Sequence, residues 1–290
     1  MNQLHRKWLY LSILAVVWGS SFILIKKALI GLTPIQIGAL RMILTAIFLL
    51  LIGFKKIQLI QRKHWKYIFY TALVGTFFPS FLFAFAITEI DSSISAILNS
   101  LTPFNAYIIG ATIFGFSFKK NQLIGVLVGL VGTIILILKG INLNPDQNYW
   151  YAILVVISSV GYAFNANIIK KYLQDLSALA ITTGNFLLLI IPAMIVLFFS
   201  DFHTNFQWDK TSISALSYVA VLSIVGTGIA KVVFNRLIQI STPVFSTSVT
   251  YLIPIVAVMW GIIDGEQLSN LQLQAGVVIL LGVYLVNKAK

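Results

Sequence analysis

The residue that most clearly indicates a binding function is a lysine inside a hydrophobic stretch. Lys231 lies within residues 213–236, which otherwise read as a membrane-spanning helix. A charged side chain at the centre of a bilayer costs at least about 2.5 kcal/mol on insertion scales. Thr227 and Asn235 lie about one helical turn before and after Lys231, so the three share one helix face. A lysine on such a face would bind a carboxylate or phosphate in a cavity; alternatively, it extends past Arg236 to the lipid headgroups.

Other polar side chains within apolar stretches extend the candidate site. Ser95, Asn99 and Thr102 recur on one face of the stretch 92–114. Polar faces of membrane helices point into the bundle or toward a water-filled cavity. The other candidates for substrate contact are Trp18, Ser80, Phe81, Tyr162, Asn165, Thr250 and Tyr251. The alternative is structural: the hydroxyls satisfy carbonyls freed by prolines, and the aromatic rings pack or face lipid.

The remaining titratable residues exclude several kinds of chemistry. Arg41 lies seven residues inside the stretch 34–54, and its long side chain either has a structural role at the outer interface or adds a second cation to a cavity. All three histidines lie outside the apolar stretches, and no acidic residue lies within a span core. A proton relay of carboxylates or histidines is therefore not expected. We expect no metal site, no cofactor and no catalytic residue.

The composition defines the elements that must position these side chains. The chain is 59% hydrophobic and 10% charged, whereas soluble domains are about 45–50% apolar and about 25% charged. Its long apolar runs predict an all-α integral membrane protein. We predict ten transmembrane helices, at residues 8–29, 34–54, 67–88, 92–114, 121–138, 150–169, 179–199, 213–236, 244–263 and 270–287.

The distribution of charge predicts the orientation. The chain has 20 Lys and Arg residues and a net charge of +12. With ten spans, most of these basic residues fall on the side that holds both termini. The positive-inside rule then places both termini in the cytoplasm and the protein in the cell (inner or plasma) membrane. The expected partner of the charge is a set of anionic lipid headgroups rather than nucleic acid.

An internal repeat divides the chain into two halves. Residues 74–103 align without gaps on residues 225–254, and Val-Gly-Thr begins both segments. We therefore predict a five-helix repeat over 1–143 and a second over 144–290. Because five is odd, the second repeat must be inverted in the membrane. Inverted repeats are typical of secondary transporters, whose substrate site lies between the halves near the midplane.

Three segments carry a family resemblance: AVVWGSSFILIKKAL (15–29), LRMILTAIFLL (40–50) and the long run from GTGIAKVVFNR to IIDGEQLS (226–269). Together with the ten spans in two halves, they resemble the drug/metabolite transporter superfamily, in particular its EamA-type members. The first half departs from the family pattern, since IFGFSFKK (113–120) lacks a counterpart of Glu266. The resemblance covers the whole chain and implies transport. It leaves the substrate open among amino acids, sugars, nucleotide derivatives and drugs.

The leading hypothesis is a transporter that exports small polar metabolites, most directly amino acids, by alternating access through a central cavity. Lys231 would hold the substrate carboxylate, and polar faces of the spans 92–114, 150–169 and 244–263 would hold the amine. The alternatives are an exchanger of phosphorylated or nucleotide-linked solutes and a multidrug efflux protein. An intramembrane lipid-modifying enzyme would need a cluster of acids, a metal or an activated nucleophile, which the sequence does not offer. We expect a monomer or weak homodimer.

Overall fold

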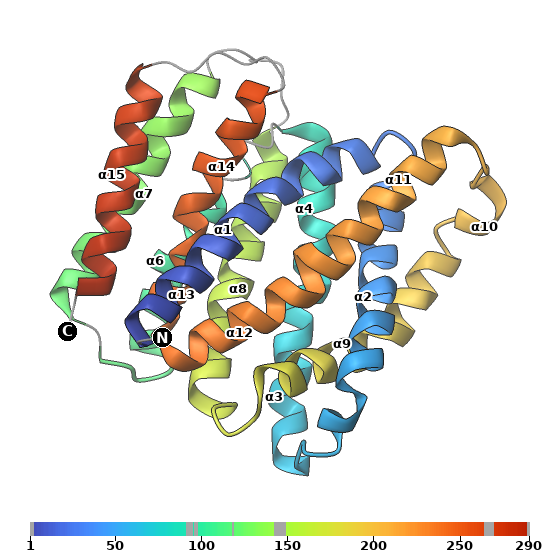
Figure 1. Ribbon diagram of the computed structural model, residues 1–290, viewed down its shortest axis with the longest axis horizontal. Coiled ribbons are helices and arrows are strands. Elements are labelled where there is room, and N and C mark those ends of the chain that lie inside the picture. The colour runs from blue at the N-terminus through green and yellow to red at the C-terminus, as the bar shows by residue number, and fades with distance from the viewer. Residues whose placement is uncertain are drawn as a thin grey trace.

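The computed structural model of the protein describes residues 3–90, 95, 98–117, 119–141, 149–263 and 270–288, and every regular element among them is a helix. The helices form an elongated bundle (Figure 1). α7 (Lys120–Ile141) and α15 (Asn270–Lys288) lie side by side at one end of the bundle. α2 (Pro34–Ile57) and α9 (Ala178–Phe198) form a second pair toward the other end.

Six helical segments in the described part of the chain are long and apolar enough to cross a membrane, which makes this a multi-pass membrane protein. Three of them are α1 (Gln3–Ala28), α2 and α9. A fourth is α8 (Ala152–Tyr172). The other two are composite: η1 (Arg62–His64) through α3 (Trp65–Ala72), η2 (Leu73–Phe77) and α4 (Phe78–Glu89), and α11 (Lys210–Val221) through η4 (Leu222–Ile229) and α12 (Ala230–Ile240). All six overlap predicted spans.

The other four predicted spans also overlap helices. α7 and α15 each cover one of them as a continuous helix, α6 (Thr102–Thr112) lies in the third, and α13 (Pro243–Thr247) with α14 (Val249–Ile263) in the fourth. The predicted continuous helix 244–263 is divided at Ser248. Two short elements complete the fold: η3 (Tyr149–Tyr151), at the start of the predicted span 150–169, and α10 (Phe202–Asn205), which lies between spans. The count of ten spans stays a prediction.

A proline in α14 explains one contact between the two halves. Pro254 has no N–H, so the Thr250 carbonyl four residues earlier lacks its helical donor. The Ser100 hydroxyl donates to that carbonyl at 3.0 Å. The carbonyl that the proline frees is therefore satisfied by the segment that precedes α6.

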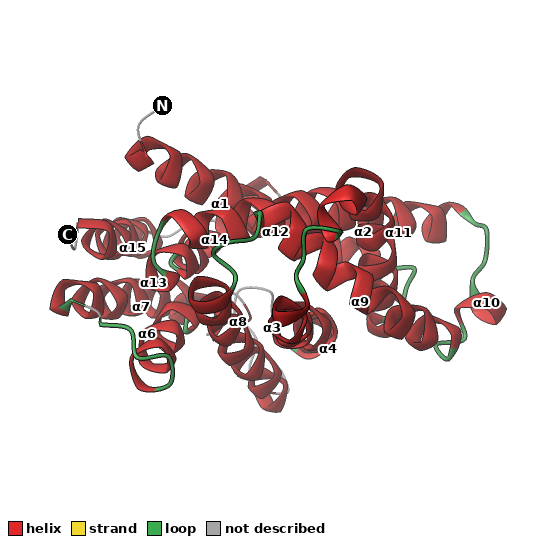
Figure 2. Cartoon of the chain, turned by 90° about the horizontal axis from the view of Figure 1, so that it is seen from below, coloured by secondary structure: helices red, strands yellow, loops and turns green. Residues whose placement is uncertain are grey.

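Glycines set the distance between α7 and α15. A Cβ atom on Gly282 would lie 2.4 Å from the backbone nitrogen of Gly129 and 2.8 Å from the Gly125 carbonyl oxygen. The two helices therefore pack backbone to backbone, as small residues permit in membranes. Figure 2 shows the same close pair from below. The glycines of α7 thus serve packing within the bundle.

Two helices widen into π-helical turns at the repeated Val-Gly-Thr segment. η2 contains Val74, Gly75 and Thr76, and η4 contains the matching Val225-Gly226-Thr227. In a π-turn the hydrogen bonds run from residue i to i+5, so the regular ladder is interrupted, and such turns are frequent at functional sites. The sequence predicts plain α-helices at both places. The π-turns make backbone carbonyls available to side-chain donors.

Candidate functional site

A cavity lies between the two halves of the chain. Its free volume is about 100 Å³, counted over positions that the centre of a water molecule can occupy. Because about 10–15 Å³ counted this way holds one water, the cavity has room for a small metabolite. Its walls come from both halves: Trp18, Ser21, Phe22, Ile25, Arg41, Phe83, Asn99 and Thr102 from the first, and Tyr162, Asn165, Gly226, Lys231, Phe234, Thr247, Val249, Thr250 and Ile253 from the second.

Lys231 lines this cavity and is held by the first half. Its ammonium group donates to the Thr76 hydroxyl at 2.6 Å and to the Gly75 carbonyl. Both acceptors belong to η2 and are uncharged. The side chain is therefore tied to the neighbouring helix in this conformation, rather than extended along α12 toward the headgroups.

Arg41 lines the same cavity and is held by the second half. Its Nε donates to the Thr227 hydroxyl at 2.6 Å. Its other N–H groups have no hydrogen-bond acceptor among the described residues. A guanidinium anchored at Nε keeps the paired Nη groups for a carboxylate or phosphate, which they can bind through two parallel hydrogen bonds.

These contacts are reciprocal. Thr76 and Thr227 occupy equivalent positions of the repeated Val-Gly-Thr segment, and each accepts from a cation of the other half. The glycine carbonyls follow the same pattern, since Gly75 accepts from Lys231 and Gly226 accepts from the indole Nε1 of Trp18 at 2.9 Å. Each π-turn thus offers a carbonyl and a hydroxyl to donors at the cavity.

The electrostatics of the cavity favour an anion. Arg41 and Lys231 lie close enough to repel each other. No aspartate or glutamate lines the cavity in the described part of the chain. Two cations in a partly desolvated site with only neutral partners attract negative charge more strongly than they would in water. The site is therefore suited to a small anion or to the anionic end of a zwitterion.

Seven of the residues predicted for the site lie at the cavity: Trp18, Asn99, Thr102, Tyr162, Asn165, Lys231 and Thr250. The rings of Tyr162 and Phe83 stack at 6.1 Å between centroids, and Trp18 meets Phe234 edge to face at 5.0 Å. These rings form apolar walls. Asn165 has a buried Oδ1 atom that lacks a hydrogen-bond partner in the structure.

Six further predicted residues lie away from the cavity wall. Thr227 accepts a hydrogen bond from Arg41 Nε, and Asn235 donates to Thr182 at 2.9 Å. The Tyr251 hydroxyl points away to the Val126 carbonyl. The last three are Ser80, whose hydroxyl donates to the Thr76 carbonyl, Phe81, which packs on Phe77, and Ser95, which is fully buried.

Ser21, Phe83 and Thr247 line the cavity but are not among the residues predicted for substrate contact. For Arg41 the sequence left two alternatives open, because its position near one end of a span is equally compatible with an interfacial role. The repeated Val-Gly-Thr segment is the signal that could have decided between them. Two equivalent acceptor hydroxyls predict two donors, and Lys231 alone does not supply both.

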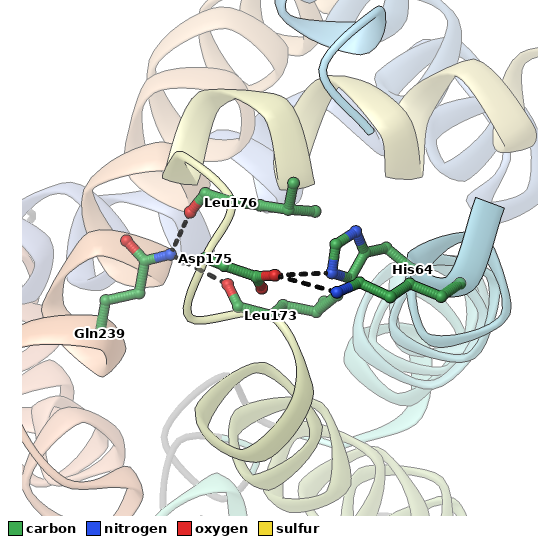
Figure 3. A network of polar contacts seen from close by, with 6 residues as sticks. His64, Leu173, Asp175, Leu176 and Gln239 are labelled. Atoms are coloured by element: carbon green, nitrogen blue, oxygen red, sulfur yellow. Dashed lines mark hydrogen bonds and ion pairs between the residues drawn. The ribbon is translucent and has the colours of Figure 1, made fainter. Parts of the chain in front are cut away.

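A second polar cluster ties η1, directly before α3, to the loop after α8, at the bottom of the view in Figure 1, and Figure 3 shows it from close by. Asp175 Oδ2 lies 3.0 Å from His64 Nε2 and 3.7 Å from Lys63 Nζ. Gln239 of α12 donates to the backbone carbonyls of Leu176 at 2.7 Å and Leu173 at 3.3 Å in the same loop. Partial desolvation raises the pKa of the Asp175 carboxyl, but its backbone hydrogen bond and His64 outweigh this, so the net pKa is lowered.

Comparison with known proteins agrees with a transporter. The model of the EamA-like transporter family matches residues 6–138 and, separately, 149–288. The chain therefore belongs to the EamA-like transporter family, and it is a membrane transporter.

Individual relatives are distant but similar over most of their length. The chain is 26% identical to "Uncharacterized inner membrane transporter YedA" of Escherichia coli, covering 96% of this chain and 89% of the relative. It is 24% identical to "Probable amino-acid metabolite efflux pump" of Salmonella typhimurium, covering 97% and 95%. A solved crystal structure shares the fold with a TM-score of 0.73 at 14% identity, covering 96% of this chain and 94% of the other.

Proposed function

We propose that this transporter exports small carboxylate-bearing metabolites, amino acids in the first place, by alternating access of the cavity between its halves. The observation that carries the proposal is the environment of Arg41. Thr227 anchors its Nε, and its remaining donors lack acceptors among the described residues, at a cavity that no described acidic residue lines. A planar guanidinium matches the geometry of a carboxylate.

The other cavity residues fit the rest of an amino acid. Lys231 supplies a second positive charge for the carboxylate. The side-chain oxygens of Asn99, Thr102 and Thr250 are acceptors for an ammonium group. The aromatic walls suit an apolar side chain, and the small free volume favours a solute with few heavy atoms. A relative named as an efflux pump for amino-acid metabolites supports the same substrate class.

The proposal includes the arrangement of the chain in the membrane. We propose ten transmembrane helices in two inverted repeats, 1–143 and 144–290. The protein lies in the cell (inner or plasma) membrane with both termini in the cytoplasm. The two separate family matches and the equivalent π-turns support the division. Anionic headgroups on the cytoplasmic side are the partners of the basic loops, and the protein is proposed to act as a monomer or weak homodimer.

The pair of cations also supports a second candidate, the exchange of small phosphorylated solutes. A phosphate carries more charge than a carboxylate and can engage Arg41 and Lys231 together. The small cavity volume favours such solutes over nucleotide-linked ones.

Counterflow in proteoliposomes tests the two candidates. Vesicles loaded with unlabelled amino acids should accumulate a labelled one through the wild-type protein. Arg41→Lys keeps the positive charge but removes the paired Nη donors of the guanidinium. We expect kcat/KM to fall about tenfold or more, because a hydrogen bond to a charged group is lost. Arg236→Gln, at an exposed cation on the same helix as Lys231, is the control and should exchange normally. Equal exchange by Arg41→Lys would contradict the proposal, and exchange of phosphorylated solutes alone would favour the second candidate.

A further inference from the structure

The two cations differ in what they must give up to bind a substrate. Arg41 uses one N–H on Thr227 and retains the paired Nη groups. An ammonium group has three N–H donors, and Lys231 uses two of them on Gly75 and Thr76. Only one donor of Lys231 remains, so a carboxylate that accepts two hydrogen bonds from this ammonium must displace a contact with η2.

The contact that would be displaced joins the two halves. Lys231 belongs to α12 in the second half, and Gly75 and Thr76 belong to η2 in the first. η2 also touches the second half through α8, where a Cβ atom on Gly161 would lie 2.5 Å from the Val74 carbonyl oxygen. A change in the Lys231 contact therefore acts on a segment that lies at the boundary between the halves.

We propose that Thr76 and Gly75 form a latch that couples substrate binding to alternating access. In the substrate-free protein the latch holds Lys231 and keeps the halves in one arrangement. The substrate anion, positioned first on Arg41, takes Lys231 from the latch and frees the halves to move. Thr227 is the equivalent positioning residue for Arg41, and its contact persists. This inference rests on the proposed function.

The latch makes a specific kinetic prediction. If the latch holds the substrate-free carrier in one arrangement, that carrier changes slowly between its two orientations. Net efflux requires this step and exchange does not, so exchange is faster than net efflux. Thr76→Val keeps the shape of the side chain but removes the hydroxyl acceptor. We expect it to raise the ratio of net efflux to exchange about tenfold, the effect of losing one hydrogen bond to a charged group.

Two matched variants separate coupling from general damage. Thr76→Ser restores the hydroxyl and should restore the wild-type ratio. Thr227→Val, at the equivalent position, loosens Arg41 and should raise KM while leaving the ratio unchanged. Because the ratio compares two fluxes through one preparation, the amount of folded protein does not affect it. An unchanged ratio in Thr76→Val, or an equal change in Thr227→Val, would overturn the latch.

A labelling experiment without substrate distinguishes failure of the latch from failure of the substrate assignment. The chain has no cysteine, so Ser21→Cys introduces a single thiol at the cavity. Adding Thr76→Val to it should change labelling by an impermeant maleimide about tenfold, faster from one face of the membrane and slower from the other. That result without amino-acid flux would keep the latch and reject the substrate. Unchanged labelling together with normal flux would reject the latch alone.

Discussion

The indole Nε1 of Trp18 donates a hydrogen bond of 2.9 Å to the carbonyl of Gly226, in the π-turn equivalent to the one that holds Lys231. The uncharged indole of Trp18 therefore donates to the glycine carbonyl of one π-turn, whereas the ammonium group of Lys231 donates to the equivalent carbonyl of the other. Gly226 itself lies at the cavity. This contact joins residues 208 positions apart in the chain.

Trp18→Phe should lower the stability of the protein. It keeps an aromatic ring against Phe234 but leaves the Gly226 carbonyl without its side-chain donor, which we expect to cost about 1–3 kcal/mol. Thermal unfolding in detergent measures the change. Trp208→Phe is the control, because Trp208 is 81% exposed. Equal unfolding temperatures for wild type and Trp18→Phe would contradict this account.

Tyr251→Phe separates a structural tyrosine from one at the cavity. The Tyr251 hydroxyl is fully buried and donates to the Val126 carbonyl at 2.9 Å, so its removal should reduce stability by about 1 kcal/mol or more without changing KM. Tyr162→Phe alters a cavity residue and should change KM. A KM effect of Tyr251→Phe larger than that of Tyr162→Phe would show that this assignment is reversed.

Asp175 gives a pH dependence with a definite sign. Its pKa is lowered in the folded protein, so the stability it contributes is present above the ordinary carboxyl pKa of about 3.9 and is lost as pH falls through the lowered value. Wild type and Asp175→Asn should therefore differ in unfolding temperature at about pH 5, where the Asp175 carboxylate is still charged. The difference should shrink at more acidic pH. A difference that disappears already between pH 7 and pH 5 would assign the effect to another group.

Gly282→Leu should separate α15 from α7. A side chain at this position meets the backbone of Gly129, which cannot move aside as a flexible side chain could. Overpacking of this kind costs about 1–3 kcal/mol or more. Val277→Leu, at a site 68% exposed on the same helix, should have little effect on the unfolding temperature. A stable Gly282→Leu protein would show that the helix pair is not tightly fixed.

The sequence predicts the long helices well because bilayer thickness and hydropathy determine them locally. The six long helices overlap predicted spans, whereas the pairing of α7 with α15 is known only from the structure. The π-turns were not predictable in this way. Val-Gly-Thr has no local feature that distinguishes a π-turn from an α-turn, and the carbonyls of the two turns accept from Lys231 and Trp18 of distant helices.

The candidate site was predictable only in part for a similar reason. Spacing places Lys231 and Thr227 on one face, but their hydrogen bonds run to different partners in the other half. Tyr251 and Thr250 are neighbours in sequence, yet one turns to Val126 and the other lines the cavity. The direction in which a side chain points is set by helix rotation, which is fixed by packing rather than by the residue itself.

The reciprocal hold of the two cations has a consequence for biosynthesis. Arg41 precedes its acceptor Thr227 by 186 residues, so the ribosome delivers the arginine to the membrane long before the hydroxyl that anchors it. Lys231 is synthesised after its acceptors Gly75 and Thr76, which are already in the membrane when it is inserted. Because long-range contacts form late and neither half can complete the site alone, the nascent first half carries an unsatisfied charge until the eighth predicted span enters the bilayer.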